Sequence, residues 1–433
     1  MCYKWREWPL SDIPLSSILK RIAVIFVSVQ HVAQERMTSG MDTQQRLAIL
    51  KKAINFDTQN GNEAVLANYL FELFKSHQIA VRTLPFGENR TNLIASLGSG
   101  NKVLALTGHM DTVSVGPRDL WDTDPLQLTA IDGKLYGRGT SDMKGGLIAF
   151  VIALIELAQE KVAIPGEVRL IVTGGEEKGQ LGSAALLGKG VISDIEALIV
   201  GEPARLSNKD GRPEQQFAIT AQNGTLDYEV ISHGKSAHSS MPEMGVNAID
   251  NLDVYLSEQK KYFAKATQVE DDVLGKIIPV DTLITGGEQI NSVPAFAKLT
   301  TKIRTTTAYP AEQIIKELQH IITRLNAEEN MDLEFHLIRK LAPVVTDNRS
   351  KIVNLVKKNG RFYFNQPVTL RSVAGTSDAA TFVKENSDMS IVMIGPGNDT
   401  SHMANEYVME EAFLNYINFI KKLILDYFNP TEN

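Results

Sequence analysis

The chain has 433 residues, of which 43% are hydrophobic and 22% charged, so it is long enough for two or three domains and has an ordinary globular composition. Its formal net charge is −7 and no long block of lysine and arginine occurs, which argues against nucleic acid as a partner. The only cysteine is Cys2, which excludes an intrachain disulfide and a thiolate metal cluster and fits a reducing, cytoplasmic location.

The N-terminal segment, residues 1–40, is predicted to lie outside the folded domains. Its apolar run at residues 22–29 follows two basic residues, as in a secretory signal, but the residues after it form a poor cleavage site. No apolar run approaches the ~18 residues of a membrane span, so no membrane partner is expected. An amphipathic helix pattern opens at Met41, and we interpret residues 1–40 as an appended leader or a start assigned too early.

From Met41 the pattern alternates between helices and strands. Helices are predicted at residues 44–54, 62–77 and 146–159. Strands are predicted at residues 79–84, 92–96, 103–107, 167–173 and 197–200, with a helix between the last two. Such alternation indicates an α/β fold with a largely parallel or mixed sheet between layers of helices.

The pattern changes after Pro203. Residues 208–215 are polar and turn-rich, which is typical of a linker or surface loop. The elements that follow are a strand, a helix, two strands, a helix and a strand, at residues 225–232, 246–263, 276–285, 297–305, 311–327 and 333–337. This βαββαβ order can form a small domain of its own. We therefore predict a discontinuous larger domain at residues 41–216 and 339–433, with a smaller domain at residues 217–338 inserted in it.

Polar side chains follow the predicted strands at the ends where sites form. His109 and Asp111 come directly after the strand at 103–107, and side chains two apart project to the same side of an extended chain. Asp142 lies in a glycine-rich loop before a helix, where open α/β sheets place their sites. For each residue alone, an ordinary loop position is the simpler interpretation, but the residues downstream repeat the pattern.

Two adjacent carboxylates, Glu176 and Glu177, follow the strand at 167–173. Their side chains diverge, so one can bind a metal ion while its neighbour holds a proton; a solvated acidic turn is the alternative. Glu202 follows the next strand, and His402 follows an apolar run near the C-terminus. Several strands thus deliver an Asp, Glu or His at one end, which random scatter would not produce.

The candidate metal ligands offer only nitrogen and oxygen donors, which suit zinc, cobalt or manganese. They are His109, Asp142, Glu177, Glu202 and His402. A single catalytic zinc usually keeps three protein ligands and a water, so five ligands divide better over two metal ions with a bridging carboxylate. Two such ions would lower the pKa of a shared water. Glu176 would take its proton as general base and pass it to the leaving nitrogen.

Five motifs together resemble those of a family of dinuclear zinc amidohydrolases. This family includes succinyl-diaminopimelate desuccinylase, acetylornithine deacetylase, aminoacylase and the glutamate-releasing type of carboxypeptidase. The motifs are Gly108-His109-Met110-Asp111, the stretch GRGTSDMKGG at residues 137–146, Glu176-Glu177, Gly201-Glu202-Pro203, and Gly395-Pro396-Gly397 with His402. The resemblance extends from about Gln44 to Phe419 and implies a catalytic domain with an inserted lid.

The resemblance also implies how the candidate residues share their roles. It divides the metal ligands into His109 and Glu202 for one ion, Glu177 and His402 for the other, and Asp142 as the bridge. It further implies that Asp111 orients His109, as metal-bound histidines generally require, and that Glu176 is the general base. The lid is implied to form the interface of a homodimer.

Within the lid, the resemblance points to three substrate contacts. Residues 234–242 resemble the segment whose histidine, here His238, stabilises the oxyanion in the partner subunit's site; a surface or helix-capping histidine is the alternative. Asn291 and Arg304 match positions that contact the substrate's carboxylate end. A guanidinium is the natural bidentate partner of a carboxylate, although Arg304 is equally a candidate for an ion pair on the lid surface.

Gly375, Thr376 and Ser377 open a Gly-Thr-Ser-Asp loop that resembles the desuccinylase branch and is predicted to bind substrate. We therefore expect hydrolysis of an N-acyl amino acid, foremost N-succinyl-LL-diaminopimelate of lysine biosynthesis. Acetylornithine deacetylase, dipeptidase and broad aminoacylase activities are alternatives within the family. A non-catalytic binding protein is an alternative of another class, but such a protein is expected to lose Glu176 or a ligand. Residues 221–224 replace a segment that often carries histidine in relatives, which leaves the fine specificity open.

Overall fold

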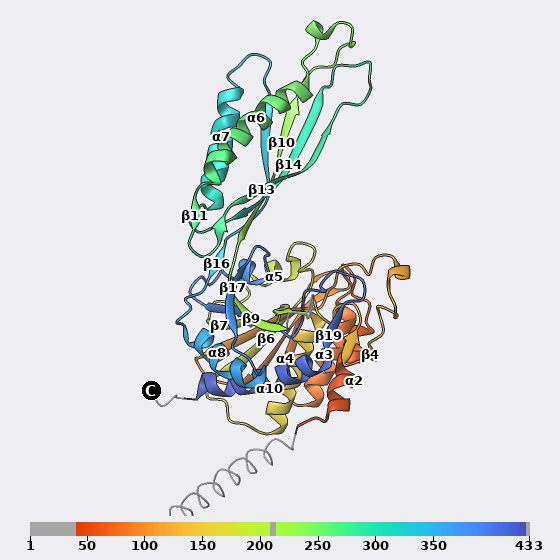
Figure 1. Cartoon of the computed structure of the whole chain (residues 1–433), viewed down its shortest axis with the longest axis vertical. Helices are drawn as coiled ribbons and strands as arrows, with labels where there is room; N and C mark the ends of the chain where they lie inside the picture. Colours follow the sequence, from red (N-terminus) through yellow and green to blue (C-terminus); the bar gives the residue numbers. More distant parts are fainter. Residues whose placement is uncertain (1–39, 208–213, 430–433) are drawn as a thin grey trace, which may run out of the picture.

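The computed structural model describes residues 40–207 and 214–429, which form a larger α/β domain and a smaller domain that projects from it (Figure 1). Apart from Gly40, the predicted leader lies outside the described residues, as does most of the predicted linker at 208–215. Each domain has its own cluster of buried apolar side chains. The predicted α/β fold with a central mixed sheet is confirmed.

The larger domain is built on a ten-stranded mixed sheet in the order β1-β2-β6-β3-β7-β18-β9-β16, with β8 and β17 also paired to β9. Its strands are β1 (Ala80–Gly87), β2 (Arg90–Gly98), β3 (Val103–His109), β6 (Glu167–Thr173), β7 (Ile195–Val200), β8 (Arg205–Leu206), β9 (Gln215–Gln222), β16 (Val344–Val345), β17 (Thr369–Val373) and β18 (Ser390–Met393). The four strands β6, β3, β7 and β18 run parallel to one another. Their carboxyl ends therefore meet at one edge of the sheet.

Helices pack around this sheet and against one another. The longer ones are α2 (Thr43–Ile54), α3 (Ala64–Ser76), α4 (Lys144–Gln159), α8 (Lys351–Tyr363) and α10 (Glu410–Phe428), and the shorter ones are α5 (Leu181–Leu186) and α9 (Ala379–Phe382). α10 contacts α4 and α8, and α2 contacts α4. α4 is buried at every position from Lys144 to Leu157, as is typical of a helix that is apolar on all sides.

The smaller domain has a four-stranded antiparallel sheet in the order β13-β14-β10-β15. Its elements in chain order are β10 (Gly224–His233), α6 (Ala248–Ala266), β13 (Ile278–Gly286), β14 (Phe296–Thr305), α7 (Ala311–Leu325) and β15 (Leu333–Leu341), which is the predicted βαββαβ order. A short hairpin of β11 (Glu270–Asp271) and β12 (Gly275–Lys276) follows α6. Buried side chains of β10 and β14 alternate along each strand and pack against both helices, so the residues between them, such as Asp227 and Lys302, lie on the other face of the sheet.

Strand pairing shifts the boundaries that we predicted for the inserted domain, residues 217–338. β9 pairs with β16, β17 and β18, so residues through Gln222 belong to the larger sheet. At the other end, β15 continues to Leu341. β9 is buried on both faces, so its sequence has no alternation of polar and apolar residues that would reveal which sheet it joins.

A three-stranded sheet of β4 (Thr129–Ile131), β5 (Lys134–Tyr136) and β19 (Tyr407–Met409) was not predicted. It joins the segment before Gly137 to the segment after His402, which are far apart in the sequence. In the described part of the chain, no helix is both long enough and apolar enough to cross a membrane.

Candidate active site

The carboxyl ends of the parallel strands, together with the loop before α4, bring the five predicted metal ligands together. The Nε2 atom of His109 lies 3.2 Å from Oδ1 of Asp142 and 3.9 Å from Oε1 of Glu202. The Nε2 atom of His402 lies 3.3 Å from Oδ2 of Asp142 and 3.0 Å from Oε1 of Glu177. Asp142 therefore lies between the two histidines and directs one carboxylate oxygen at each.

The donor chemistry and electrostatics of this cluster fit divalent cations. His109, Asp142 and Glu177 each offer a ligand atom, and these atoms all lie within 4.8 Å of one another. Burial, followed by repulsion from Asp142, raises the pKa of Glu202 to about 8, and burial also raises the pKa of Glu176 well above its ordinary value. Buried carboxylates that crowd one another need compensating positive charge, and imidazole and carboxylate ligands suit zinc-like ions.

The two histidines supply part of that positive charge as protons. Hydrogen bonds to Asp142 and Glu177 raise the pKa of His402 to about 10. Burial lowers the pKa of His109, but its hydrogen bond to Asp142 and the nearby carboxylates outweigh this effect and raise it well above the ordinary value. Because a metal ion binds neutral imidazole, a bound cation would displace these protons.

Asp111 is fully buried and holds both His109 and the loop that follows β6. The Nδ1 atom of His109 donates a hydrogen bond to the backbone oxygen of Asp111 at 2.9 Å, whereas the nearest carboxylate oxygen of Asp111 is 3.7 Å away. That carboxylate instead accepts the backbone N–H groups of Glu176 and Glu177 at 3.2 and 3.1 Å. Because the backbone oxygen of Asp111 binds Nδ1 of His109, Nε2 of that ring is available for a metal ion. The side chain of Asp111 holds the backbone of Glu176 and Glu177.

Glu406 is a buried residue of the site that the sequence analysis missed. Its Oε1 atom accepts three backbone N–H groups, at 3.1, 2.8 and 2.9 Å, from Gly139, Ser141 and Asp142. Its Oε2 atom accepts a hydrogen bond from Arg138 at 2.5 Å. Its place four residues after His402 was the available signal, but a glutamate in a loop is ordinarily solvated.

A cavity of about 340 Å³ lies over this group. Its walls contain Asp142, Glu176, Glu177, Glu202 and His402, together with the predicted substrate-binding residues Gly375, Thr376 and Ser377. Apolar side chains that were not predicted, including Ile219 and Met393, complete the lining. Gln222 also lines it and accepts hydrogen bonds from the backbone and hydroxyl of Ser377 at 3.1 and 3.0 Å, so residues 221–224 do contribute to this site.

His238 and Asn291 do not line this cavity and lie together in the smaller domain. The backbone N–H of Ser239 donates to the backbone oxygen of Asn291 at 3.0 Å, and Nδ1 of His238 is 2.7 Å from the hydroxyl of Ser240. The segments that contain them lie at the end of the smaller domain away from the larger one (Figure 1). Within one chain, His238 therefore lies apart from the metal-ligand cluster.

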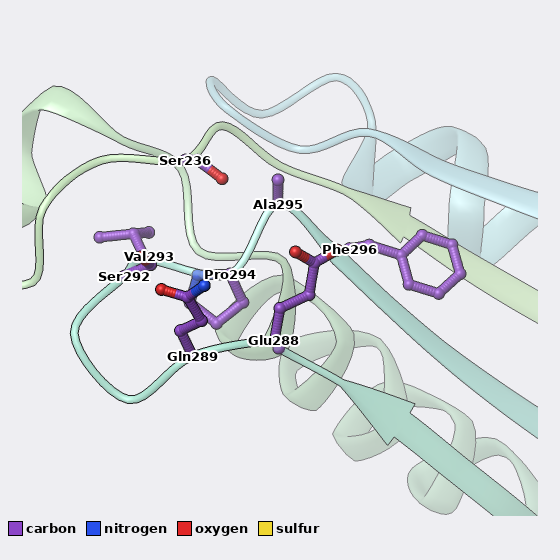
Figure 2. Close-up of a pocket in the computed structure, with 9 residues that line it drawn as sticks. Ser236, Glu288, Gln289, Ser292, Val293, Pro294, Ala295 and Phe296 are labelled. Carbon is purple, nitrogen blue, oxygen red and sulfur yellow. The ribbon is translucent and has the colours of Figure 1, made fainter.

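A second cavity, of about 240 Å³, lies beside these segments. Figure 2 shows that its lining comes from the loop between β13 and β14, with Ser236 contributed by the segment after β10. The labelled acidic group is Glu288, and no histidine lines the cavity. It therefore lacks the donor set of the first cavity.

Arg304 lies near the opposite end of the smaller domain, on β14. Its Nη1 atom donates to the hydroxyl of Thr225 at 2.8 Å. Within residues 40–207 and 214–429 it forms no ion pair with a carboxylate, so the surface ion pair considered from sequence is not formed there.

Comparison with known proteins identifies the family. Residues 105–426, well over half of the chain, match the model of peptidase family M20/M25/M40. The chain belongs to this family. As an M20 member it is a metal-dependent amide hydrolase, which confirms the predicted enzyme class.

Among similar M20 proteins, a "Probable succinyl-diaminopimelate desuccinylase" of Staphylococcus aureus (strain MRSA252) is 34% identical over 410 residues, which cover 89% of this chain and 98% of that protein. A "Succinyl-diaminopimelate desuccinylase" of Wolbachia pipientis wMel is 27% identical over 401 residues, covering 89% and 94%. A metallo-carboxypeptidase structure from Sulfolobus solfataricus has a TM-score of 0.72 at 18% identity, covering 89% of this chain and 99% of that one. A tripeptidase structure from S. aureus has a TM-score of 0.71 at 20% identity, covering 89% and 98%. These two structures support the fold alone.

Proposed function

We propose that this enzyme hydrolyses N-succinyl-LL-diaminopimelate to succinate and LL-diaminopimelate, using two divalent metal ions. Zinc is the first choice, with cobalt or manganese as alternatives. The observation that carries the metal chemistry is the position of Asp142 between His109 and His402. The names of the two relatives above favour the succinyl substrate. We include a cytoplasmic location and a role in lysine biosynthesis in this proposal.

The chain's own residues divide the work at the reacting amide. His109 and Glu202 would hold one ion, Glu177 and His402 would hold the other, and Asp142 would contribute to both. When bound, the ions activate a water and polarise the scissile carbonyl. Glu176 takes the proton from the attacking water and gives it to the leaving nitrogen. The positive charge of the bound metal ions would favour the ionised form of Glu176, which a general base requires. Gly375, Thr376 and Ser377 bind the substrate across the cavity.

We further propose that the active unit is a homodimer formed through the smaller domain. β13 is an edge strand of its sheet, and the side chains of Val280, Leu283 and Ile284 on it are exposed. An exposed apolar edge strand is a surface on which a second copy can pair. The partner's smaller domain would then bring His238 and Asn291 to the cavity, where the histidine stabilises the oxyanion and Asn291 contacts the substrate.

The substrate assignment is tested with zinc- or cobalt-loaded protein offered N-succinyl-LL-diaminopimelate, N-acetylornithine and a dipeptide in parallel. We expect a strong preference for the succinyl substrate and two metal ions per chain by elemental analysis. Preference for acetylornithine or the dipeptide would replace the substrate and keep the metal site. One metal ion per active chain would contradict the dinuclear site, and Glu177→Ala is expected to lower the metal content.

The dimer is tested by mixing two inactive variants, Glu176→Gln and His238→Ala. If His238 acts across the interface, a mixed dimer has one complete site. Because half of randomly formed dimers are mixed, about a quarter of the wild-type activity should return. Mixed dimers that form but stay inactive would show that His238 does not act in the partner's site. Activity in His238→Ala alone would remove its catalytic role.

A further inference from the structure

A row of charged side chains crosses the sheet of the smaller domain on the face opposite α6 and α7. Asp227 on β10 is in register with Lys302 on β14 and with Arg339 on β15. Its carboxylate lies 3.3 Å from Nζ of Lys302 and 3.1 Å from Nε of Arg339. Arg304 is two residues beyond Lys302 on the same strand and therefore lies on the same face.

This row contains more positive charge than the neighbouring carboxylate can balance. Asp227 is shared by two cations, and Arg304 has only the hydroxyl of Thr225 as a side-chain partner in the described ranges. Farther along the same face, Lys298 and Glu229 form a one-to-one pair at 2.9 Å. Partly buried cations in excess of their counter-ions favour the binding of an anion.

Arg339 also lies beside the loop that carries the catalytic glutamates. A Cβ atom placed on Gly179, two residues after Glu177, would be 3.7 Å from Nη1 of Arg339. Figure 1 shows α5, which follows this loop, at the side of the larger domain that is next to the smaller domain. The charged row thus adjoins the catalytic loop.

The orientation of Arg339 leaves part of its guanidinium available. Asp227 accepts a hydrogen bond from Nε of Arg339 at 3.1 Å, while Nη1 points toward the open side of Gly179, where a Cβ atom would lie. A guanidinium has five N–H donors in a rigid plane, so the terminal nitrogens can still bind a carboxylate in a bidentate manner. Asp227 holds the side chain in place, which reduces the rotamer entropy that binding would cost.

We propose that Arg339 binds a carboxylate of the substrate that is distant from the scissile amide, and so selects substrates with more than one carboxylate. This rests on the proposed amide hydrolysis at the metal site and narrows its substrate class. A substrate without the distal carboxylate leaves the excess cations unpaired, which lowers its affinity.

The test compares three substrates on the full chain loaded with zinc. N-succinyl-LL-diaminopimelate is set against its N-butanoyl analogue, which lacks the acyl carboxylate, and against Nα-succinyl-L-lysine, which lacks the ε-carboxylate. The variant is Arg339→Gln. Lys340→Gln is the matched control, because it removes an adjacent cation whose partner is the exposed Glu312, at 2.7 Å.

Loss of a hydrogen-bonded charge pair should lower kcat/KM for the succinyl-diaminopimelate substrate by about 10- to 100-fold in Arg339→Gln, chiefly through KM. For the analogue that lacks the recognised carboxylate, the loss should be far smaller. Lys340→Gln should leave kcat/KM unchanged for all three substrates. Arg339→Lys should recover part of the preference for the substrate that carries the recognised carboxylate. An equal loss on all three substrates, or no loss, would overturn the inference while the proposed function stands.

Failure of the proposed function gives a different pattern. If the wild-type enzyme cleaves none of the three substrates but cleaves dipeptides, Ala-Glu and Ala-Gln replace them as the matched pair. A selective loss on Ala-Glu in Arg339→Gln supports the inference, and an equal effect on both overturns it. If no amide is cleaved, the binding of succinate and of butanoate to the wild type and to Arg339→Gln is compared by calorimetry. A selective loss of succinate binding in Arg339→Gln supports the inference, and an equal effect on both ligands overturns it.

Discussion

At the scale of single residues, the position of Asp142 depends on a second carboxylate that is not itself a candidate ligand. Glu406 accepts the backbone N–H of Asp142 and of two residues before it, and pairs with the buried Arg138. Glu406 lies four residues after His402, so its side chain joins the loops that present the candidate ligands Asp142 and His402. A carboxylate that satisfies three N–H groups in a buried place restricts the loop to one conformation.

We expect Glu406→Gln to weaken metal binding and to lower kcat. The amide can accept fewer of these hydrogen bonds and leaves Arg138 buried without a counter-ion, which should destabilise the fold by about 3–5 kcal/mol. Zinc content, thermal unfolding and kcat measure the three effects. Glu411→Gln, on the exposed side of α10, is the control. Full zinc affinity in a folded Glu406→Gln variant would show that Glu406 does not position Asp142.

Residues in motifs could be placed from the sequence, whereas residues defined by long-range packing could not. His109 ends the buried strand β3 and Glu202 lies two residues after the end of β7, so their position at the sheet edge was predictable from the strands alone. Glu406 contacts a segment more than two hundred residues earlier in the chain, and Arg339 contacts Asp227 on the neighbouring strand β10. Their partners depend on strand pairing that a single sequence does not specify.

At the scale of elements, three helices meet at one buried carboxylate. Glu156 on α4 accepts hydrogen bonds from Nε and Nη2 of Arg46 on α2 at 2.8 and 2.9 Å, and from Lys421 on α10 at 2.8 Å. Its side chain is fully buried. Since the N-terminus of α4 follows Asp142, this contact also holds the helix that leads out of the candidate site.

We expect Glu156→Ala to destabilise the protein by about 3–5 kcal/mol, because both cations lose a buried partner. Glu160→Ala, one turn farther along α4, removes only a contact to Lys421 at 2.6 Å and should cost less than about 1 kcal/mol. Denaturant unfolding of metal-loaded protein compares the two variants. Equal destabilisation by the two variants would mean that burial does not increase the contribution of Glu156 to the free energy of unfolding.

Element types were more predictable than element ends and partners. The βαββαβ order of the smaller domain follows from changes in hydrophobic period, and each of its six elements lies within a few residues of its predicted place. The strand at 333–337 extends to Leu341, and this extension carries Arg339. Polar strand ends have no periodic apolar signal, so the sequence alone did not reveal them.

At the scale of the whole molecule, metal binding and folding should be linked. The candidate ligands come from segments that only the folded sheet brings together, so cations bind the folded state and stabilise it, by about 2.7 kcal/mol at one hundred times Kd. Without cations, the raised pKa values of Glu202 and Glu406, about 8 and about 7, make folding favour their protonated forms. For an acid whose folded pKa lies above its unfolded pKa, stability falls as pH rises between the two values.

We therefore expect the metal-free protein to lose thermal stability between about pH 5 and pH 8, and the zinc-loaded protein to lose much less over the same range. Calorimetry with and without a chelator measures the difference in Tm, which should widen with pH. Glu177→Ala should narrow this difference, because one metal site is weakened. A metal-free Tm that rises over this range would contradict the assigned carboxylate cluster.

The order of strands in the larger sheet has a consequence for biosynthesis. β18, near the C-terminus, lies between β7 and β9, which are both made much earlier. A growing chain therefore cannot complete this sheet until β18 has left the ribosome, and His402 and Glu406 emerge later still. Domains generally fold as units while the N-terminal part is made first. The smaller domain is continuous in sequence and can fold during translation, but the enzyme can gain activity only after His402 and Glu406 have left the ribosome.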